Sequence, residues 1–329
     1  MTDTVRDLDA AVAPRSIVAR PAPWTEPALL RAVGAFLLGC YAVGLPSYVW
    51  LRGVPFEREQ VLVLLLVAVV GVVLVRGGSL TDVRRAARDW AVFGLLFAAY
   101  DLTRGVSDTL GMPVLEAVPI EIDKMLFGAV PTVELQNRLG PFSGERWWEG
   151  LISITYVSHF IVPYVLTAVL WVRKRATWRA WIVQFSTLTV AGLATYILAP
   201  TKPPWLASQD GLLPPLERTA ARGWRRFDLE IAERLVDKGQ VGDVVNLVAA
   251  LPSLHAAYAL LFSVFLWRRV GWYWRPALAA YPLVMAFGLV ISGEHYVFDV
   301  LVGWFYVVAV VVLWHRVSRR PDVADWVRS

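Results

Sequence analysis

Two histidines in this sequence stand near the starts of long apolar segments. His255 follows Ser253, and His295 follows Gly293. An ionisable side chain is costly to keep in a membrane segment, so each histidine is a candidate for a functional site. Asp299 lies four residues after His295. On a helix this spacing places the carboxylate and the imidazole on one face, one turn apart.

This constellation suggests phosphoryl transfer. Imidazole is a nucleophile near neutral pH and histidine can form covalent intermediates, so His295 is the candidate for attack on phosphorus. Asp299 would hold the other ring nitrogen and stabilise positive charge on the ring. His255 would donate a proton to the departing alkoxide, and would then take one from water or from an acceptor hydroxyl. Two histidines and a carboxylate are also a known metal-ligand set. That alternative stays open, although we expect no metal and no cofactor.

The phosphate would need cationic and amide ligands. Ser253 is a good helix N-cap and Gly293 opens the segment of His295, and two helix N-termini that point at one spot form an anion site. Lys202 and Arg104, at the outer ends of predicted spans, could stabilise the transferring group there. The simpler alternatives are a snorkelling Lys202 and an interfacial salt bridge between Arg104 and Asp101.

Other polar and aromatic residues are candidates for a substrate cavity. His159 lies about eleven residues into a predicted span, which is deep for a histidine. It could line a substrate cavity or make a buried hydrogen bond. Trp205 follows Lys202 closely and could border the headgroup, whereas His315 ends the last predicted span among arginines and suggests no role.

The composition predicts an all-α, polytopic membrane protein. The chain has 329 residues, of which 57% are hydrophobic and only 18% charged, with 16 Trp. Apolar runs of about 17 to 25 residues indicate membrane spans. The eight predicted spans are residues 29–50, 60–76, 89–105, 148–172, 178–199, 253–269, 274–292 and 294–315.

The net charge of +5 reflects arginines at alternate ends of these spans rather than one basic soluble face. We therefore expect no nucleic-acid partner. Basic clusters follow the second, fourth, sixth and eighth spans, and the positive-inside rule makes those ends cytoplasmic. His255 and His295 then share the extracytoplasmic face of a cell membrane.

The same topology predicts the domain organisation. We expect a disordered cytoplasmic tail at residues 1–27, a membrane catalytic domain at 28–316 and a second cytoplasmic tail at 317–329. Extracytoplasmic loops cover 106–147 and 200–251. An amphipathic pattern from Glu121 to Leu135 and another at Leu229–Val236 predict short interfacial helices. Cys40 is the only cysteine, so no intrachain disulfide can form.

Two motifs resemble those of a known family. Pro252-Ser253-Leu254-His255, and the run from His295 through Asp299 to Gly303, resemble the second and third signature motifs of the type 2 phosphatidic acid phosphatase superfamily. Within it, the chain looks most like the inositol phosphorylceramide synthase branch, over roughly residues 101–304. The resemblance implies a six-helix catalytic core and metal-independent chemistry through a phosphohistidine. It also implies His295 as nucleophile, Asp299 as its partner and His255 as acid.

The cationic part of the family pattern differs in this sequence. The usual first motif, a lysine followed after six residues by Arg-Pro, is absent before His255, and Leu289 stands where the third motif usually has an arginine. The segment from Tyr196 to Trp205 resembles the Pro-rich replacement in the ceramide-handling branch. Tyr196 and Trp205 are therefore candidates for the substrate cavity, and the departure favours a transferase.

We therefore expect a membrane-embedded lipid phosphotransferase that moves a phosphoryl-headgroup, such as inositol phosphate, between lipids through a phosphohistidine. Its partners would be a phospholipid or lipid-phosphate substrate and a lipid or alcohol acceptor, and the oligomeric state is left open. One alternative is a lipid-phosphate phosphatase that uses water as the acceptor. A proton-relaying transporter is another, but it would predict inverted repeats and charges deep in several spans, which the sequence lacks.

Overall fold

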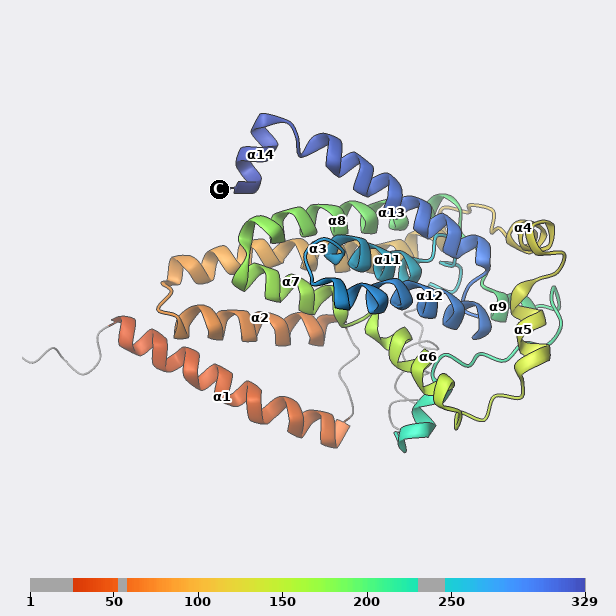
Figure 1. Cartoon of the computed structure of the whole chain (residues 1–329), viewed down its shortest axis with the longest axis horizontal. Coiled ribbons are helices and arrows are strands. Elements are labelled where there is room, and N and C mark those ends of the chain that lie inside the picture. The colour runs from red at the N-terminus through yellow and green to blue at the C-terminus, as the bar shows by residue number, and fades with distance from the viewer. Residues whose placement is uncertain (1–25, 53–57, 230–245, 329) are drawn as a thin grey trace, which may run out of the picture.

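The computed structural model describes residues 26–52, 58–229 and 246–328 (Figure 1). Nearly all of the predicted tail at 1–27, and of the interfacial helix predicted at Leu229–Val236, lies outside the described residues. Within those ranges the regular structure is helical, and extended pairing is limited to isolated bridges that join Leu115, Thr201 and Ala249.

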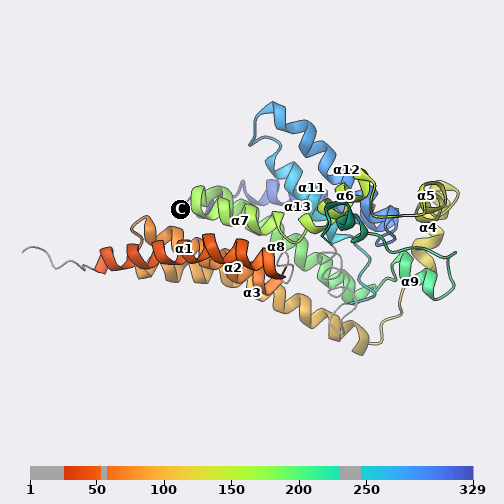
Figure 2. The same ribbon diagram turned by 90° about the horizontal axis from the view of Figure 1, so that it is seen from below.

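Long apolar helices form a bundle, and short helices gather at one of its ends (Figures 1 and 2). In chain order the elements are α1 Glu26–Arg52, α2 Arg58–Val75, α3 Leu80–Thr109, α4 Ala117–Phe127, α5 Pro131–Leu139, α6 Trp147–Ser158, α7 Val162–Arg173, α8 Arg175–Leu198, α9 Pro204–Gln209, η1 Arg222–Phe227, α11 Leu254–Leu266, η2 Trp272–Trp274, α12 Arg275–Ile291, α13 Val297–Val317 and α14 Pro321–Arg328. Helices α4, α5 and α9 lie at the end where α12 meets α13.

The prediction of an all-α membrane bundle is confirmed, and each of the eight predicted spans contains a helix. In the described part of the chain, four helical segments are long and apolar enough to cross a membrane: α1, α8, η2 with α12, and α13. The bent pair α6 and α7 fits as a fifth, while α2 and α11 are apolar but shorter. The first ten residues of α3 carry five charges. Eight crossings therefore stay a prediction.

The fourth predicted span is broken rather than continuous. Helices α6 and α7 meet at an angle of 52° across residues 159–161. Pro163, in the first turn of α7, has no backbone N–H to donate to the preceding turn, which favours a break at this point. His159 stands at this break and is buried, with 8% of its surface exposed.

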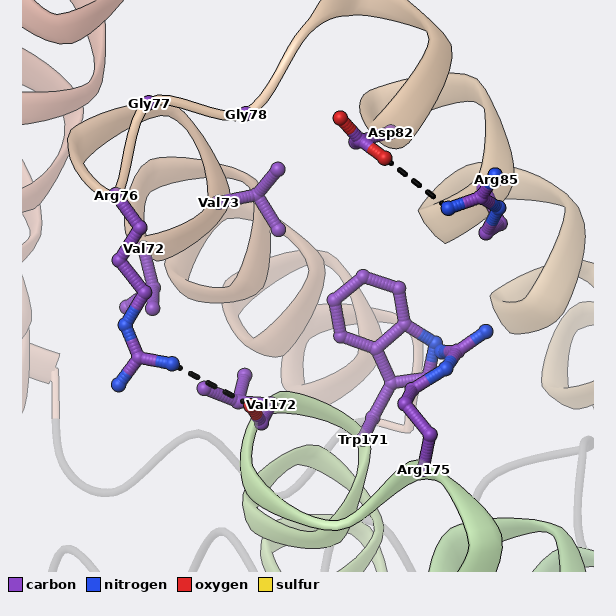
Figure 3. Close-up of a pocket in the computed structure, with 10 residues that line it drawn as sticks. All are labelled: Val72, Val73, Arg76, Gly77, Gly78, Asp82, Arg85, Trp171, Val172 and Arg175. Atoms are coloured by element: carbon purple, nitrogen blue, oxygen red, sulfur yellow. Dashed lines mark hydrogen bonds and ion pairs between the residues drawn. The ribbon is translucent and has the colours of Figure 1, made fainter. Parts of the chain in front are cut away.

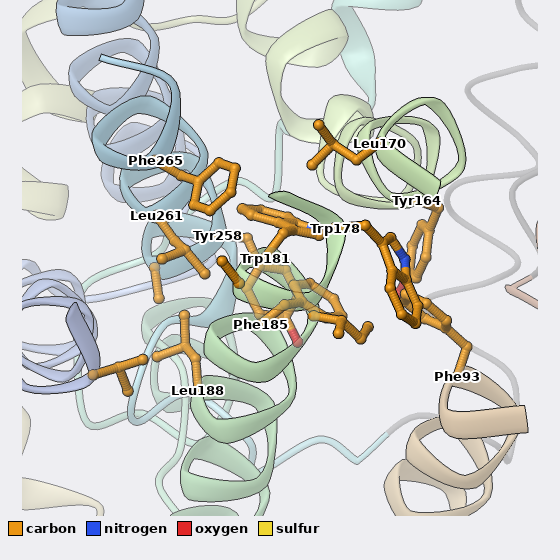
Figure 4. Packing of buried hydrophobic residues seen from close by; sticks show 14 of the residues in the cluster. Phe93, Tyr164, Leu170, Trp178, Trp181, Phe185, Leu188, Tyr258, Leu261 and Phe265 are labelled. Atoms are coloured by element: carbon orange, nitrogen blue, oxygen red, sulfur yellow. The ribbon is translucent and has the colours of Figure 1, made fainter. Parts of the chain in front are cut away.

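An aromatic core joins α11 to the middle of the bundle (Figure 4). Trp181 of α8 is fully buried, packs edge-on against Phe265 of α11 at 5.1 Å between ring centroids, and donates its indole N–H to the Thr167 hydroxyl at 2.8 Å. Phe185 packs against Tyr258 at 4.7 Å. Close packing of this kind drives helix association in lipid, where burial from water contributes little. The core thus fixes the position of α11.

Two glycines allow neighbouring helices to approach the start of α11. A Cβ atom on Gly192 of α8 would lie 2.7 Å from the Leu254 side chain, and one on Gly303 of α13 would lie 2.6 Å from the Ser253 carbonyl oxygen. Either distance is shorter than packed atoms tolerate. Because these positions carry no side chain, α13 can approach the backbone at the start of α11, and α8 can pack closely on the Leu254 side chain.

We predict that Gly303→Ala destabilises the protein by about 1–3 kcal/mol, because the added methyl group overpacks a contact with rigid backbone. The matched control is Gly39→Ala in α1, where a Cβ meets nothing within 4 Å. Thermal unfolding in detergent compares the two variants. Equal unfolding temperatures would contradict the packing described for α11 and α13.

Candidate active site

The turn between α12 and α13 positions His295. Gly293 has a φ of +77°, a conformation natural for glycine, and the amides of Glu294 and His295 both donate to the Leu289 carbonyl, at 3.0 and 3.2 Å. His295 therefore lies two residues before α13 begins at Val297. The helix in the span predicted at 294–315 therefore begins a little later than predicted, because this turn ends α12 first.

The predicted approach of Asp299 to His295 is nevertheless confirmed. Oδ2 of Asp299 lies 3.5 Å from Nδ1 of His295 and accepts a hydrogen bond from the Tyr296 amide at 2.9 Å. The Asp299 side chain is completely buried. The same carboxylate thus caps the first turn of α13 and faces the imidazole. This leaves Nε2 as the ring nitrogen on the side away from Asp299.

His255 lies beside His295. The two ring centroids are 5.8 Å apart. Ser253 is the N-cap of α11, as predicted, and its hydroxyl accepts from the Ala256 amide at 3.3 Å. The Ser253 amide donates to the backbone carbonyl of Asp299 at 3.0 Å. One hydrogen bond therefore links the starts of the two helices that carry the histidines.

Aromatic rings hold His255 on its other side. His159, from the break between α6 and α7, stacks on His255 at 3.9 Å between centroids, and Tyr156 stacks on it at 4.8 Å. His159 also stacks on Tyr258 at 5.0 Å. The sequence left open whether His159 lines a substrate cavity or makes a buried hydrogen bond. In the structure its ring stacks directly on His255, one of the paired histidines.

Tyr196 and Trp205 contact the backbone that flanks the histidines. The Tyr196 hydroxyl donates to the Pro252 carbonyl at 3.0 Å, and the side chain is buried. The Trp205 amide donates to the Gly293 carbonyl at 3.0 Å. Both predicted cavity residues therefore support the segments that precede His255 and His295.

Comparison with known proteins agrees with this arrangement. A family model described as the PAP2 superfamily matches residues 132–313, a range that includes His255, His295 and Asp299. The chain belongs to the PAP2 superfamily.

Two relatives place it in the inositol phosphorylceramide synthase-like branch. The chain is 30% identical over 224 residues to a phosphoinositol dihydroceramide synthase of Bacteroides thetaiotaomicron. The matched region covers 65% of this chain and 70% of that protein. It is 25% identical over 170 residues to the inositol phosphorylceramide synthase catalytic subunit aur1 of Schizosaccharomyces pombe, covering 51% of this chain and 40% of that protein. No solved structure matches the chain.

Lys202 and Arg104 are the two cations predicted to bind phosphate in this PAP2 superfamily member, and the structure describes the surroundings of Lys202. The Lys202 ammonium group contacts Asp210 and lies 2.6 Å from Glu116. Hydrogen bonds to Asp210 and then to Glu116 raise the pKa of Lys202. Its charge is thus already matched by two carboxylates. Arg104 belongs to α3, but its side chain lies outside the part that the structure describes.

A cation that the sequence did not single out pairs with Glu294, the residue before His295. Arg218, between α9 and η1, makes a two-pronged ion pair with Glu294, with N–O distances of 2.7 and 3.0 Å. Its guanidinium group lies 4.5 Å from the centre of the Trp205 ring. Gln136 of α5 fixes the same segment, since its amide group bonds both Glu217 and the Ile291 carbonyl. Arg218 is one arginine among several in a long loop, so only the folded loop distinguishes it.

Asp123 of α4 is a second residue whose position the sequence did not reveal. It is completely buried, and its two carboxylate oxygens accept hydrogen bonds from the amides of Val297 and Phe298, at 3.1 and 2.9 Å. It therefore caps α13 from another helix, beside the Asp299 cap. Burial raises the pKa of Asp123 to about 6 and the charge of Asp299 adds to this, although the two amide hydrogen bonds oppose it.

Asp123→Asn should change how stability depends on pH. The folded pKa of about 6 lies above the unfolded value of 3.8, so the stability contributed by this group is fully present below the unfolded value and is lost as the pH rises through about 6. Asparagine does not titrate. Thermal unfolding across this range should show wild type losing stability relative to the variant as the pH rises. Parallel curves would contradict a buried, titrating cap.

Proposed function

We propose that this protein is a membrane lipid phosphotransferase that moves a phospho-headgroup from a phospholipid to the hydroxyl group of another lipid. Inositol phosphate is the first candidate headgroup, and a ceramide-type lipid the first candidate acceptor, because the names of both relatives indicate them. The observation that carries the proposal is the pairing of His255 with His295 at 5.8 Å between ring centroids, with Asp299 behind His295.

In the first half-reaction, Nε2 of His295 attacks phosphorus, and the bond from phosphorus to the diacylglycerol oxygen breaks. His255 donates a proton to that oxygen as it leaves. Asp299 holds Nδ1–H of His295 and stabilises the positive ring of the phosphohistidine. The products of this step are diacylglycerol and an enzyme that carries the phospho-headgroup.

In the second half-reaction, neutral His255 removes the proton of the acceptor hydroxyl. The acceptor oxygen attacks phosphorus, and the P–N bond to His295 breaks. Amides at the start of α11 would support the phosphate oxygens in both steps, because those at the start of α13 already donate to Asp299 and Asp123. The stacking of His159 and Tyr156 on His255 supports this double role, because it keeps one ring orientation for donating and for accepting the proton.

The reaction centre would face the extracytoplasmic side. Basic residues cluster at the opposite ends of the spans, as at Arg76 after α2 and at 173–175 between α7 and α8. By the positive-inside rule those ends are cytoplasmic. Donor and acceptor lipids would then reach the histidines from the outer leaflet.

Reconstituted enzyme with headgroup-labelled phosphatidylinositol tests the transfer reaction. We expect label to appear on an added ceramide, at a rate that depends on the ceramide concentration. Release of free inositol phosphate at an unchanged rate without ceramide would favour a phosphatase and contradict the transferase.

His295→Ala should lower turnover about a thousandfold or more, because the nucleophile and the charge it carries are lost together. His315→Ala is the matched control, since that histidine is exposed at the other end of α13. Initial rates in the same vesicles provide the measurement. Full turnover by His295→Ala would exclude the proposed nucleophile.

We infer that Arg218, rather than Lys202, supplies the positive charge that the missing family motif would have provided. Phosphate oxygens would share the guanidinium group with Glu294. Arg218→Gln should lower kcat/KM about 100-fold, because charge-assisted hydrogen bonds are the strong ones. The control Arg138→Gln removes an exposed arginine paired with Glu134 on α5 and should have little effect. A large loss with Lys202→Gln and none with Arg218→Gln would return the assignment to Lys202.

A further inference from the structure

A basic cavity lies at the end of the bundle remote from the histidines (Figures 1 and 3). It has a volume of about 390 Å³ and lies between the turn that joins α2 to α3 and the junction of α7 with α8. Helix α8 begins at Arg175 beside this cavity and runs for 24 residues to Leu198 near the active-site end, a length of roughly 36 Å. The cavity is therefore not part of the reaction centre.

The charged groups that line the cavity are mainly cationic. They are Arg76, Arg85 and Arg175, against one carboxylate, Asp82. Asp82 pairs with Arg85 at 3.1 Å, and both side chains are substantially exposed. Among the described residues, Arg76 donates a hydrogen bond to the Val172 carbonyl at 3.3 Å. Two of the three guanidinium groups thus retain most of their capacity to bind an anion.

Arg175 gives independent support. Its guanidinium group bonds Asp89 and lies 4.5 and 4.9 Å from the ring centres of Trp171 and Trp178. Its nitrogen Nη1 is buried and has no hydrogen-bond partner among the described residues. A buried, unsatisfied N–H of a charged group is costly. An acceptor oxygen from a ligand would remove that cost if the Arg175 side chain turned so that Nη1 faced the cavity.

The remaining lining is apolar and lies where α2 and α7 end. Val72, Val73, Trp171 and Val172 line it, together with the backbone of Gly77 and Gly78. Tryptophan and arginine at helix ends are typical of the lipid headgroup region. Basic pockets between membrane helices on the cytoplasmic side suit anionic headgroups. A cavity with arginines and this apolar lining suits a ligand that has both a phosphate group and acyl chains, as a phospholipid has.

We propose that this cavity binds the phosphate of an anionic phospholipid from the leaflet opposite the active site, held by Arg76, Arg85 and Arg175. The bound lipid would link α2 and α3 to the start of α8, because Arg76 directly follows α2, Arg85 lies in α3 and Arg175 begins α8. The protein would then be more stable in a membrane whose cytoplasmic leaflet is anionic. The site requires no turnover, so it can be tested in His295→Ala protein and is separable from the proposed transfer reaction.

The test compares thermal unfolding of full-length protein in neutral detergent with dioleoylphosphatidylglycerol, with dioleoylphosphatidylcholine or with inorganic phosphate. We expect phosphatidylglycerol to raise the unfolding temperature and phosphatidylcholine to leave it nearly unchanged. The Arg76→Gln, Arg85→Gln double variant should need about tenfold more phosphatidylglycerol for the same shift. The matched control, Arg319→Gln with Arg320→Gln, removes two exposed arginines that follow α13, and should behave as wild type.

Equal shifts from the two lipids, or equal behaviour of the two double variants, would overturn the proposal. A full shift with inorganic phosphate alone would overturn the assignment to a lipid. A measurement on unaltered protein guards against a misfolded variant. A photoreactive phosphatidylglycerol should label peptides at residues 72–85 and 171–175, and labelling confined to other regions would also overturn the proposal.

Discussion

One backbone hydrogen bond determines the geometry on which the proposed chemistry depends. The amide of Ser253 donates to the carbonyl of Asp299 at 3.0 Å and so joins the starts of α11 and α13. Gly303 makes this approach possible, because any side chain there would strike the Ser253 carbonyl. His255 and His295 lie beside this junction, so their separation is set by main-chain contacts rather than by flexible side chains. A nucleophile and its acid partner benefit from such fixed positions.

The carboxylates around this junction are compensated by amide hydrogen bonds and by an arginine. Asp123 and Asp299 both accept hydrogen bonds at the start of α13, and Glu294 is neutralised by Arg218. Carboxylates at a helix N-terminus are favourable because the helix dipole is positive there. Acidic groups close to a phosphate site would otherwise repel the substrate. A phosphate at this site, as proposed, would therefore depend on Arg218 and on the N-terminus of α11, because carboxylates already cap α13.

The sequence predicted the paired histidines, Asp299, the Ser253 cap and the helical class, because each depends on local spacing and apolar periodicity. It did not predict Asp123 or Arg218, because each acts across a long chain separation. Asp123 contacts residues more than 170 positions away. The break at His159 was also missed, although Pro163 was a visible signal, since the apolar run continues through it. Lys202 was predicted as a phosphate ligand from its place in the sequence, yet the nearby Asp210 and the distant Glu116 both pair with it.

The covalent intermediate tests the central claim most directly. Purified enzyme would be mixed with phosphatidylinositol in the absence of any acceptor lipid, quenched without acid because phosphohistidine is acid-labile, digested, and examined by mass spectrometry. The account predicts that the peptide containing His295 carries the added mass of inositol phosphate, and that later addition of ceramide discharges it. An unmodified His295 peptide under conditions of active turnover, or the modification on His255 instead, would contradict it.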